Sequence, residues 1–99
     1  MTNPRLIDVL RQQLESFNPD EQKLIVIGDM NLDYLSENSD VKALKVLLAS
    51  KQLQQKIVGP THNLRNCIDH IYTNIENCIC GVSETYFSDH KAVWLALHP

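Results

Sequence analysis

The chain has 99 residues and a formal net charge of −3, from nine Lys and Arg against twelve Asp and Glu. This length allows one domain, residues 1–99, and the acidic balance with scattered positive charges argues against an extended basic surface for nucleic acid. The apolar runs are far too short to cross a bilayer and no secretory segment is visible, so we expect no membrane association and an intracellular location, cytoplasmic or nuclear.

The first predicted element is a helix over Thr2–Phe17. Asn3 can cap this helix, and Pro4 suits its first position because a proline there gives up no intrahelical hydrogen bond. The sequence Asn18-Pro19-Asp20 ends it. Its apolar residues recur at helical spacing and would form one buried stripe: Ile7, Leu10, Leu14 and Phe17.

A strand is predicted next, over Lys23–Ile27. Its run Leu24-Ile25-Val26-Ile27 is apolar throughout, which is typical of a strand buried on both faces. The segment Gly28–Asn38 is predicted to be a loop. Ser39 can cap a second helix, in which four apolar residues would face inward: Val41, Leu44, Leu47 and Leu48.

Four further strands complete the predicted order. The last of them is apolar on both faces, so the helices can cover one face of the sheet while the other face needs a second layer. Tyr72 and Trp94 are expected in the core. The sequence therefore predicts an α/β fold with a mostly antiparallel or mixed sheet and helices on one face. The four strands are a short one around Lys56–Val58, followed by a turn at Gly59-Pro60, and then Cys67–Asn74, Ile79–Phe87 and Lys91–His98.

Three cysteines are present: Cys67, Cys78 and Cys80. An odd number without a secretory segment indicates reduced thiols in an intracellular setting. With His70 they could be drawn as a zinc site, but the spacing is poor for the usual Cys-x-x-Cys pair. We therefore expect ordinary strand cysteines.

Three short motifs lie at predicted strand ends, where α/β proteins place their chemistry. They are Gly28-Asp29-Met30-Asn31, Ile68-Asp69-His70-Ile71 and Ser88-Asp89-His90. Together they supply three aspartates, one amide and one histidine. Such a set suits metal-assisted hydrolysis of a phosphodiester, and the acidic balance of the chain fits a metal site.

In this order the three motifs resemble the last three motifs of the endonuclease/exonuclease/phosphatase family. The segment from Pro60 to Ile71 is similar to the endonuclease domains of non-LTR retrotransposons. The resemblance runs from Leu24 to Leu97 and covers the C-terminal half of the family's domain, so the chain would be a single partial domain and half of a four-layer α/β sandwich. It implies a divalent-metal-dependent phosphodiesterase acting on DNA, although relatives cleave RNA, inositol phosphates and sphingolipids.

The resemblance also implies catalytic roles. Asp29 would position or deprotonate the attacking water, and Asn31 would donate to the scissile phosphate, although both are also ordinary turn residues. Asp69 would accept from His90 and orient it toward the phosphate or the water. A buried aspartate is costly unless paired, so a partner is expected for Asp69. His90 is the best candidate, and adjacent backbone or Arg65 is the alternative.

Metal and substrate contacts are implied as well. Asp89 would be the ligand for Mg²⁺ or Mn²⁺, unless Ser88-Asp89 only caps a turn. The family's metal-binding glutamate belongs to its N-terminal half, so binding by this chain alone is expected to be weak. Thr61, His62 and Arg65 form a loop near the site, in which Thr61 and Arg65 would bind substrate unless the loop is simply solvated.

Several alternatives remain at this point. The chain could be a catalytically inactive fragment that acts as an interaction or structural module. Its uncovered sheet face would be buried by the family's N-terminal half or by another copy of the chain. His70 should be packed rather than catalytic. Surface or cap charges without a catalytic role are expected at Asp33, Glu37 and Asp40, and His98 has no signal.

Overall fold

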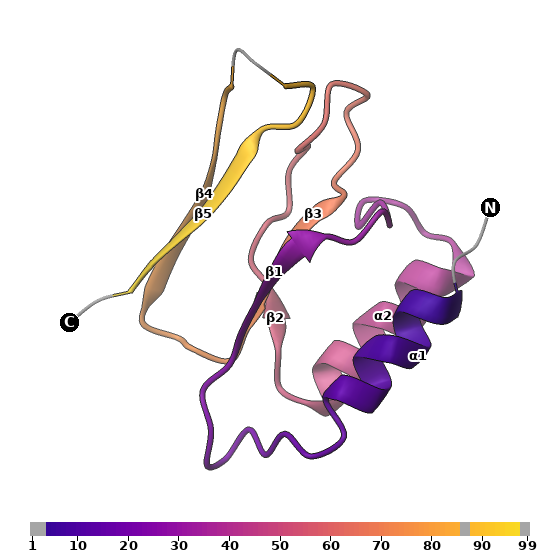
Figure 1. The fold of residues 1–99 in the computed structure, drawn as a ribbon, viewed down its shortest axis with the longest axis vertical. Coiled ribbons are helices and arrows are strands. Elements are labelled where there is room, and N and C mark those ends of the chain that lie inside the picture. The colour runs from indigo at the N-terminus through magenta and orange to yellow at the C-terminus, as the bar shows by residue number, and fades with distance from the viewer. Residues whose placement is uncertain (1–3, 86–87, 98–99) are drawn as a thin grey trace.

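The structure, a computed structural model, describes residues 4–85 and 88–97. Two helices and five strands follow one another along these residues (Figure 1). Every strand pair in these residues is antiparallel, and the strands form one three-stranded sheet in the order β1-β3-β2 and one two-stranded sheet of β4 and β5. The predicted α/β class is confirmed. The elements are α1 (Pro4–Gln13), β1 (Ile25–Asp29), α2 (Ser39–Ser50), β2 (Gln54–Gln55), β3 (Asp69–Thr73), β4 (Cys78–Ser83) and β5 (Ala92–Leu97).

The three-stranded sheet lies between the two helices and the β4–β5 sheet (Figure 1). Successive side chains of a strand point to opposite faces, and β3 uses this alternation to join two buried clusters. Tyr72 packs with the helices, together with Leu10 and Leu44. Ile71 packs on the other face, where Val93 and Leu95 of β5 partly cover it. Because both faces of β3 are covered, this strand is the centre of the fold.

β1 differs from its prediction in position and in burial. It runs from Ile25 to Asp29, so Gly28 and Asp29 belong to the strand. Val26 packs against the helix side, but Ile25 and Ile27 on the opposite face are 36% and 53% exposed. The prediction of burial on both faces is therefore wrong, because the β4–β5 sheet covers β3 and leaves this side of β1 open.

The helices also begin and end at different residues. α1 ends at Gln13, before the predicted end, and the predicted cap Asn3 lies outside the described residues. α2 is capped by Asn38, whose side chain accepts a hydrogen bond from the Val41 amide at 3.0 Å. Ser39 is the first residue of this helix and not its cap. The four predicted inward residues of α2 are all buried.

The remaining strands are shorter than predicted. β2 lies two residues before the predicted Lys56–Val58, and β3 begins at Asp69 and ends at Thr73. β4 and β5 stop at Ser83 and Leu97, while the predicted strand ends Phe87 and His98 lie outside the described residues.

Two aromatic residues were predicted in the core, and one of them is there. Tyr72 is fully buried, as expected. Trp94 is 41% exposed, so its core prediction is wrong. Its indole lies over Gly81 on the paired strand, where an added Cβ would overlap the ring. Gly81 is therefore required by this close approach of Trp94.

His70 is fully buried, which confirms that it is a packed residue. Its Nε2 lies 2.8 Å from the Cys67 carbonyl and its Nδ1 lies 2.6 Å from the Tyr72 hydroxyl. A carbonyl can only accept, so Nε2 carries the proton and Nδ1 accepts from the hydroxyl. Burial lowers the pKa of His70 and keeps the ring neutral.

No helix in residues 4–85 and 88–97 is long and apolar enough to span a bilayer.

Candidate functional site

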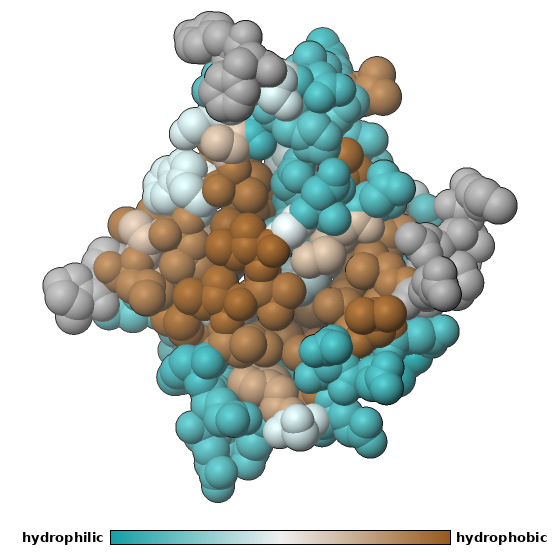
Figure 2. All heavy atoms as spheres, in the orientation of Figure 1, coloured by the Kyte–Doolittle hydropathy of each residue, from teal (hydrophilic) through white to brown (hydrophobic). Residues whose placement is uncertain are grey.

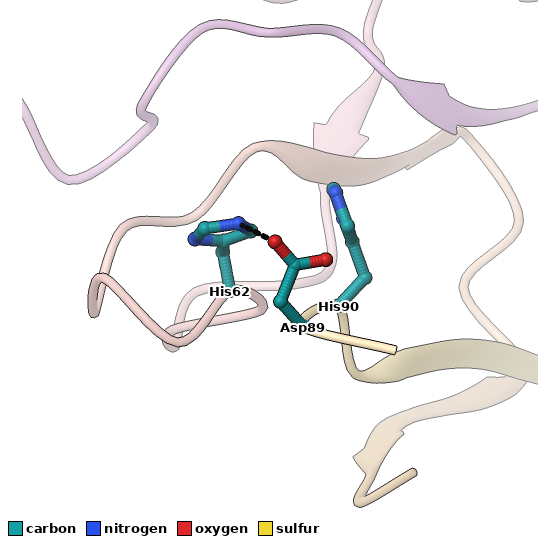
Figure 3. Close-up of side chains that lie close together, drawn as sticks. All are labelled: His62, Asp89 and His90. Carbon is teal, nitrogen blue, oxygen red and sulfur yellow. Dashed lines mark hydrogen bonds and ion pairs between the residues drawn. The ribbon is translucent and has the colours of Figure 1, made fainter. Parts of the chain in front are cut away.

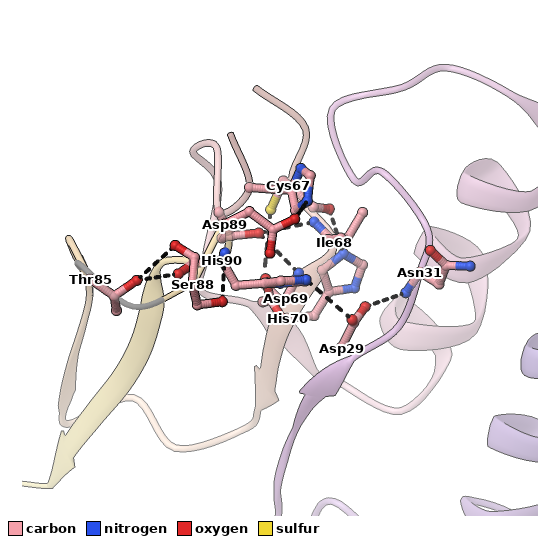
Figure 4. A network of polar contacts seen from close by, with 12 residues as sticks. Asp29, Asn31, Cys67, Ile68, Asp69, His70, Thr85, Ser88, Asp89 and His90 are labelled. Carbon is pink, nitrogen blue, oxygen red and sulfur yellow. Dashed lines mark hydrogen bonds and ion pairs between the residues drawn. The ribbon is translucent and has the colours of Figure 1, made fainter. Parts of the chain in front are cut away.

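The three motifs come together at one end of the β1–β3 pair (Figure 4). Asp29 ends β1 and Asp69 begins β3, and these two residues are direct partners in the antiparallel register. The segment Ser88–His90 precedes β5 and lies beside them, with His90 Nδ1 at 2.9 Å from Asp69 Oδ2. His90 Nε2 lies 3.9 Å from Asp29 Oδ2. The fold thus places two carboxylates and one imidazole in a single group.

The predicted pair of Asp69 and His90 is present. The Asp69 carboxylate can only accept, so His90 Nδ1–H donates to it and His90 Nε2 is left facing Asp29. The Asp69 side chain is 13% exposed and that of His90 is 33% exposed. The hydrogen bond to Asp69 raises the pKa of His90, and the charges of Asp29 and Asp89 act in the same direction. His90 is therefore oriented by one carboxylate and kept protonated to higher pH than an isolated histidine.

We expect Asp69→Asn to lower the pKa of His90. The asparagine oxygen can still accept from Nδ1–H, but it no longer stabilises the positive charge of the imidazolium. An NMR titration of the four histidines measures this directly. Asp8→Asn, which removes an exposed carboxylate on α1, is the matched control and should leave His90 unchanged. An unchanged His90 titration in Asp69→Asn would contradict the pairing.

Asp89 has a partner that the sequence did not indicate. His62 Nε2 lies 2.9 Å from Asp89 Oδ2 (Figure 3). This hydrogen bond is the main cause that lowers the pKa of the Asp89 carboxyl. The Asp89 side chain is otherwise 62% exposed, whereas that of His62 is 13% exposed. The Asp89 carboxylate is therefore exposed at the surface, and one of its oxygens is held by His62.

Thr61 does not have the predicted substrate-binding position. It is fully buried, and its Oγ1 accepts hydrogen bonds from the amides of Ile68 and Asp69, each at 3.1 Å. Its side chain offers no surface to a substrate, and it instead fixes the start of β3. Arg65, the second predicted contact, is exposed at the turn of the same loop with a φ of 64°. Of the two, only Arg65 has an exposed side chain.

Asn31 is also placed differently from its prediction. It has a φ of 52°, so the backbone is left-handed and not extended. Its amide donates to Asp29 Oδ1 at 2.9 Å, which makes a local turn. Figure 4 shows the Asn31 side chain turned away from His90. This conformation therefore does not support the implied role of Asn31 as a donor to a phosphate beside His90.

Asp33 was expected to be a solvated surface charge, but it has a structural role. Its Oδ1 accepts hydrogen bonds from the amides of Cys67 and Leu35 at 2.8 and 3.1 Å. These bonds tie the loop after β1 to the residues that precede β3. Asp33 therefore helps to hold Asp29 and Asp69 at the same edge of the sheet.

Two groups of side chains could hold a metal ion within the described part of the chain, and neither includes a cysteine. One is His62, Asp89 and His90, and the other is Asp29, Asp69 and His90. Exposed carboxylate oxygens, which Asp29 and Asp89 supply, are the ligands that Mg²⁺ and Mn²⁺ prefer. The donor set therefore fits a hard divalent cation.

The cysteines do not favour a zinc site. All three are free thiols. Burial raises the pKa of Cys67 to about 11, so the thiolate that binds zinc is disfavoured there. The zinc interpretation therefore has no support from the geometry.

Comparisons with known proteins supply no relative for this site: no family model, no curated protein and no solved structure matches the chain. The interpretation rests on the geometry. Sequence reasoning found Asp29, Asp69 and His90 but missed the role of His62, because 27 residues separate it from Asp89 and nothing local marks the pair. The two meet through a main-chain bridge between His62 and His90.

Proposed function

We propose that this chain is the C-terminal portion of an endonuclease/exonuclease/phosphatase domain and that it acts in divalent-metal-dependent hydrolysis of DNA phosphodiesters. The observation on which this proposal rests is the convergence of Asp29, Asp69 and His90 beside the exposed Asp89. The three ordered sequence motifs support the family, and the segment before β3 supports DNA as the substrate.

His90 is the group proposed to meet the reacting phosphate or water. Asp69 accepts a hydrogen bond from His90 Nδ1–H and fixes the ring, so Nε2 is directed at the exposed edge of the site. The raised pKa of His90 favours the imidazolium, which suits contact with an anionic phosphate. Deprotonated His90 could instead accept a proton through Nε2.

Asp29 and Arg65 complete the proposed set. Asp29 Oδ1 is engaged by the Asn31 amide, which leaves Oδ2, on the side of His90, to accept from a water molecule. The exposed guanidinium of Arg65 is suited to a phosphate contact at the loop. Asn31 is the proposed phosphate donor in a conformation in which its side chain turns toward His90.

Asp89 is the residue proposed to hold Mg²⁺ or Mn²⁺, which when bound would supply positive charge to the phosphate. One exposed carboxylate is a weak ligand set for Mg²⁺. We therefore expect weak metal binding by this chain alone.

The proposed four-layer sandwich requires a second sheet over the open face of β1. Ile25 and Ile27 lie on that face and are partly exposed. A complementary half of the domain, or a second copy of this chain, would bury them. The same exposed residues favour the second candidate function, a catalytically inactive interaction module. For such a module no metal-dependent nicking of DNA is expected.

Incubation with supercoiled plasmid and Mg²⁺ tests the proposed function. We expect slow nicking that stops without metal and falls to background in Asp29→Ala and His90→Ala, since a positioned acid or base contributes about 10²–10⁴-fold. Asp8→Ala on α1 is the matched control and should nick like the unmodified chain. Equal nicking by the unmodified chain and by all three variants would come from a contaminant and would contradict the proposed function. Parallel RNA and inositol phosphate substrates test the choice of DNA.

A further inference from the structure

The loop of residues 61–66 packs against the segment that carries Asp89 and His90. His62 and His90 form an isolated antiparallel bridge, and their rings meet edge to face with centroids 4.9 Å apart. The Asn63 amide donates to the Asp89 carbonyl at 2.9 Å, and the Lys91 amide donates to the Thr61 carbonyl at 2.7 Å. The loop therefore supports the backbone on both sides of Asp89.

The ring of His62 is fixed in one tautomer. The Leu64 amide donates to His62 Nδ1 at 3.1 Å, so Nδ1 has no proton when the ring is neutral. The proton then sits on Nε2, which donates to Asp89 Oδ2 at 2.9 Å. A metal ion on Nε2 would require the proton to move to Nδ1, where it would oppose the Leu64 amide. His62 is thus built as a hydrogen-bond donor and not as a metal ligand.

We propose that His62 is the positioning residue of Asp89. Its Nε2–H holds Oδ2 and orients the carboxylate so that the remaining oxygen, on the side of His90 in Figure 3, is left for a divalent cation. The inference rests on the proposed function, in which Asp89 holds that cation. Hydrogen bonds to a ligating carboxylate set its orientation, and their loss costs about 10–100-fold in metal affinity.

Two substitutions separate the two hydrogen bonds of His62. In His62→Gln the side-chain amide reaches the position of Nε2, so it can donate to Asp89 but cannot accept from Leu64. In His62→Asn the side chain ends near the position of Nδ1, so it can accept from the Leu64 amide but cannot reach Asp89. If His62 positions Asp89, divalent-cation binding should be weakened in the asparagine variant and retained in the glutamine variant.

Mn²⁺ is the probe, because its paramagnetic broadening of the Lys91 and Ala92 amide signals detects weak binding. We expect His62→Asn to weaken Mn²⁺ binding about 10–100-fold, His62→Gln to retain most of it, and Asp89→Asn to abolish it. Excess Mg²⁺ should reverse the broadening. If the asparagine variant binds like the wild type, or if glutamine is the worse of the two, the positioning role is overturned and the proposed function stands.

The metal-free protein gives an independent readout. A long-range ¹⁵N–¹H spectrum of the imidazole rings should show the Nε2–H tautomer for His62, and an Nδ1–H tautomer would overturn the inference whatever the metal data show. If the wild type gives this tautomer but binds no Mn²⁺, the failure lies in the proposed metal site, and the positioning of Asp89 for a cation falls with it.

Discussion

Thr61→Val is expected to destabilise the domain by roughly 2–6 kcal/mol. Valine has the shape of threonine, but it cannot accept the two hydrogen bonds that Thr61 Oγ1 receives from the amides of Ile68 and Asp69. A buried N–H that loses its partner costs about 1–3 kcal/mol, and two of them are affected here. A domain of this size has about 5–15 kcal/mol of total stability, so the variant would lose a large fraction of it.

Thr61→Ser is the matched control because it keeps the oxygen and removes only a methyl group. We expect it to cost about 1 kcal/mol. Urea unfolding followed by circular dichroism measures both variants. If Thr61 instead bound substrate, as its sequence position suggested, valine would lower activity and leave the unfolding midpoint unchanged.

Local sequence reasoning was sufficient where residue type and spacing alone decide the outcome. Helical spacing alone predicted the buried face of α2, since Val41, Leu44 and their neighbours need only a period of 3.6 residues. The cost of a buried carboxylate correctly indicated a partner for Asp69. Both predictions depend on the residue type and on contacts that any packed domain must make.

Several predictions that depend on tertiary position were wrong. The burial of β1 could not be judged from Ile25 and Ile27, because their apolar character is the same whether or not another layer covers them. Thr61 and Asp33 looked like polar loop residues, but they supply acceptors for the backbone amides of Cys67, Ile68 and Asp69 at the start of β3. Asn31 adopts a left-handed turn that its spacing from Asp29 did not reveal.

The second large expected effect concerns association. Apolar surface extends from the β4–β5 sheet across β1 (Figure 2). The exposed apolar residues of these strands include Ile25, Ile27, Val82 and Leu97, which are between 36% and 56% exposed. Monomers rarely expose a contiguous apolar patch beyond a few hundred Å², and covering ~300 Å² is worth ~7 kcal/mol at about 25 cal/mol per Å². This gain is comparable to the lower part of the ~4–15 kcal/mol that association costs.

We therefore expect the chain to self-associate at micromolar concentration, and Ile27→Lys to weaken that association by ~30–100-fold. Ile27 is 53% exposed on the open face of β1, so a lysine can stay in water in the free chain but must lose water in the complex. A symmetric dimer would carry the change twice, and about 1–1.4 kcal/mol per copy gives this range. Val46→Lys is the matched control, because Val46 is 70% exposed on α2, and α2 lies on the other side of the three-stranded sheet from β4 and β5. Sedimentation equilibrium measures all three proteins. A wild-type chain that stays monomeric and melts cooperatively would show that the exposed residues do not form an interface, and the second layer of the proposed sandwich would lose its physical support.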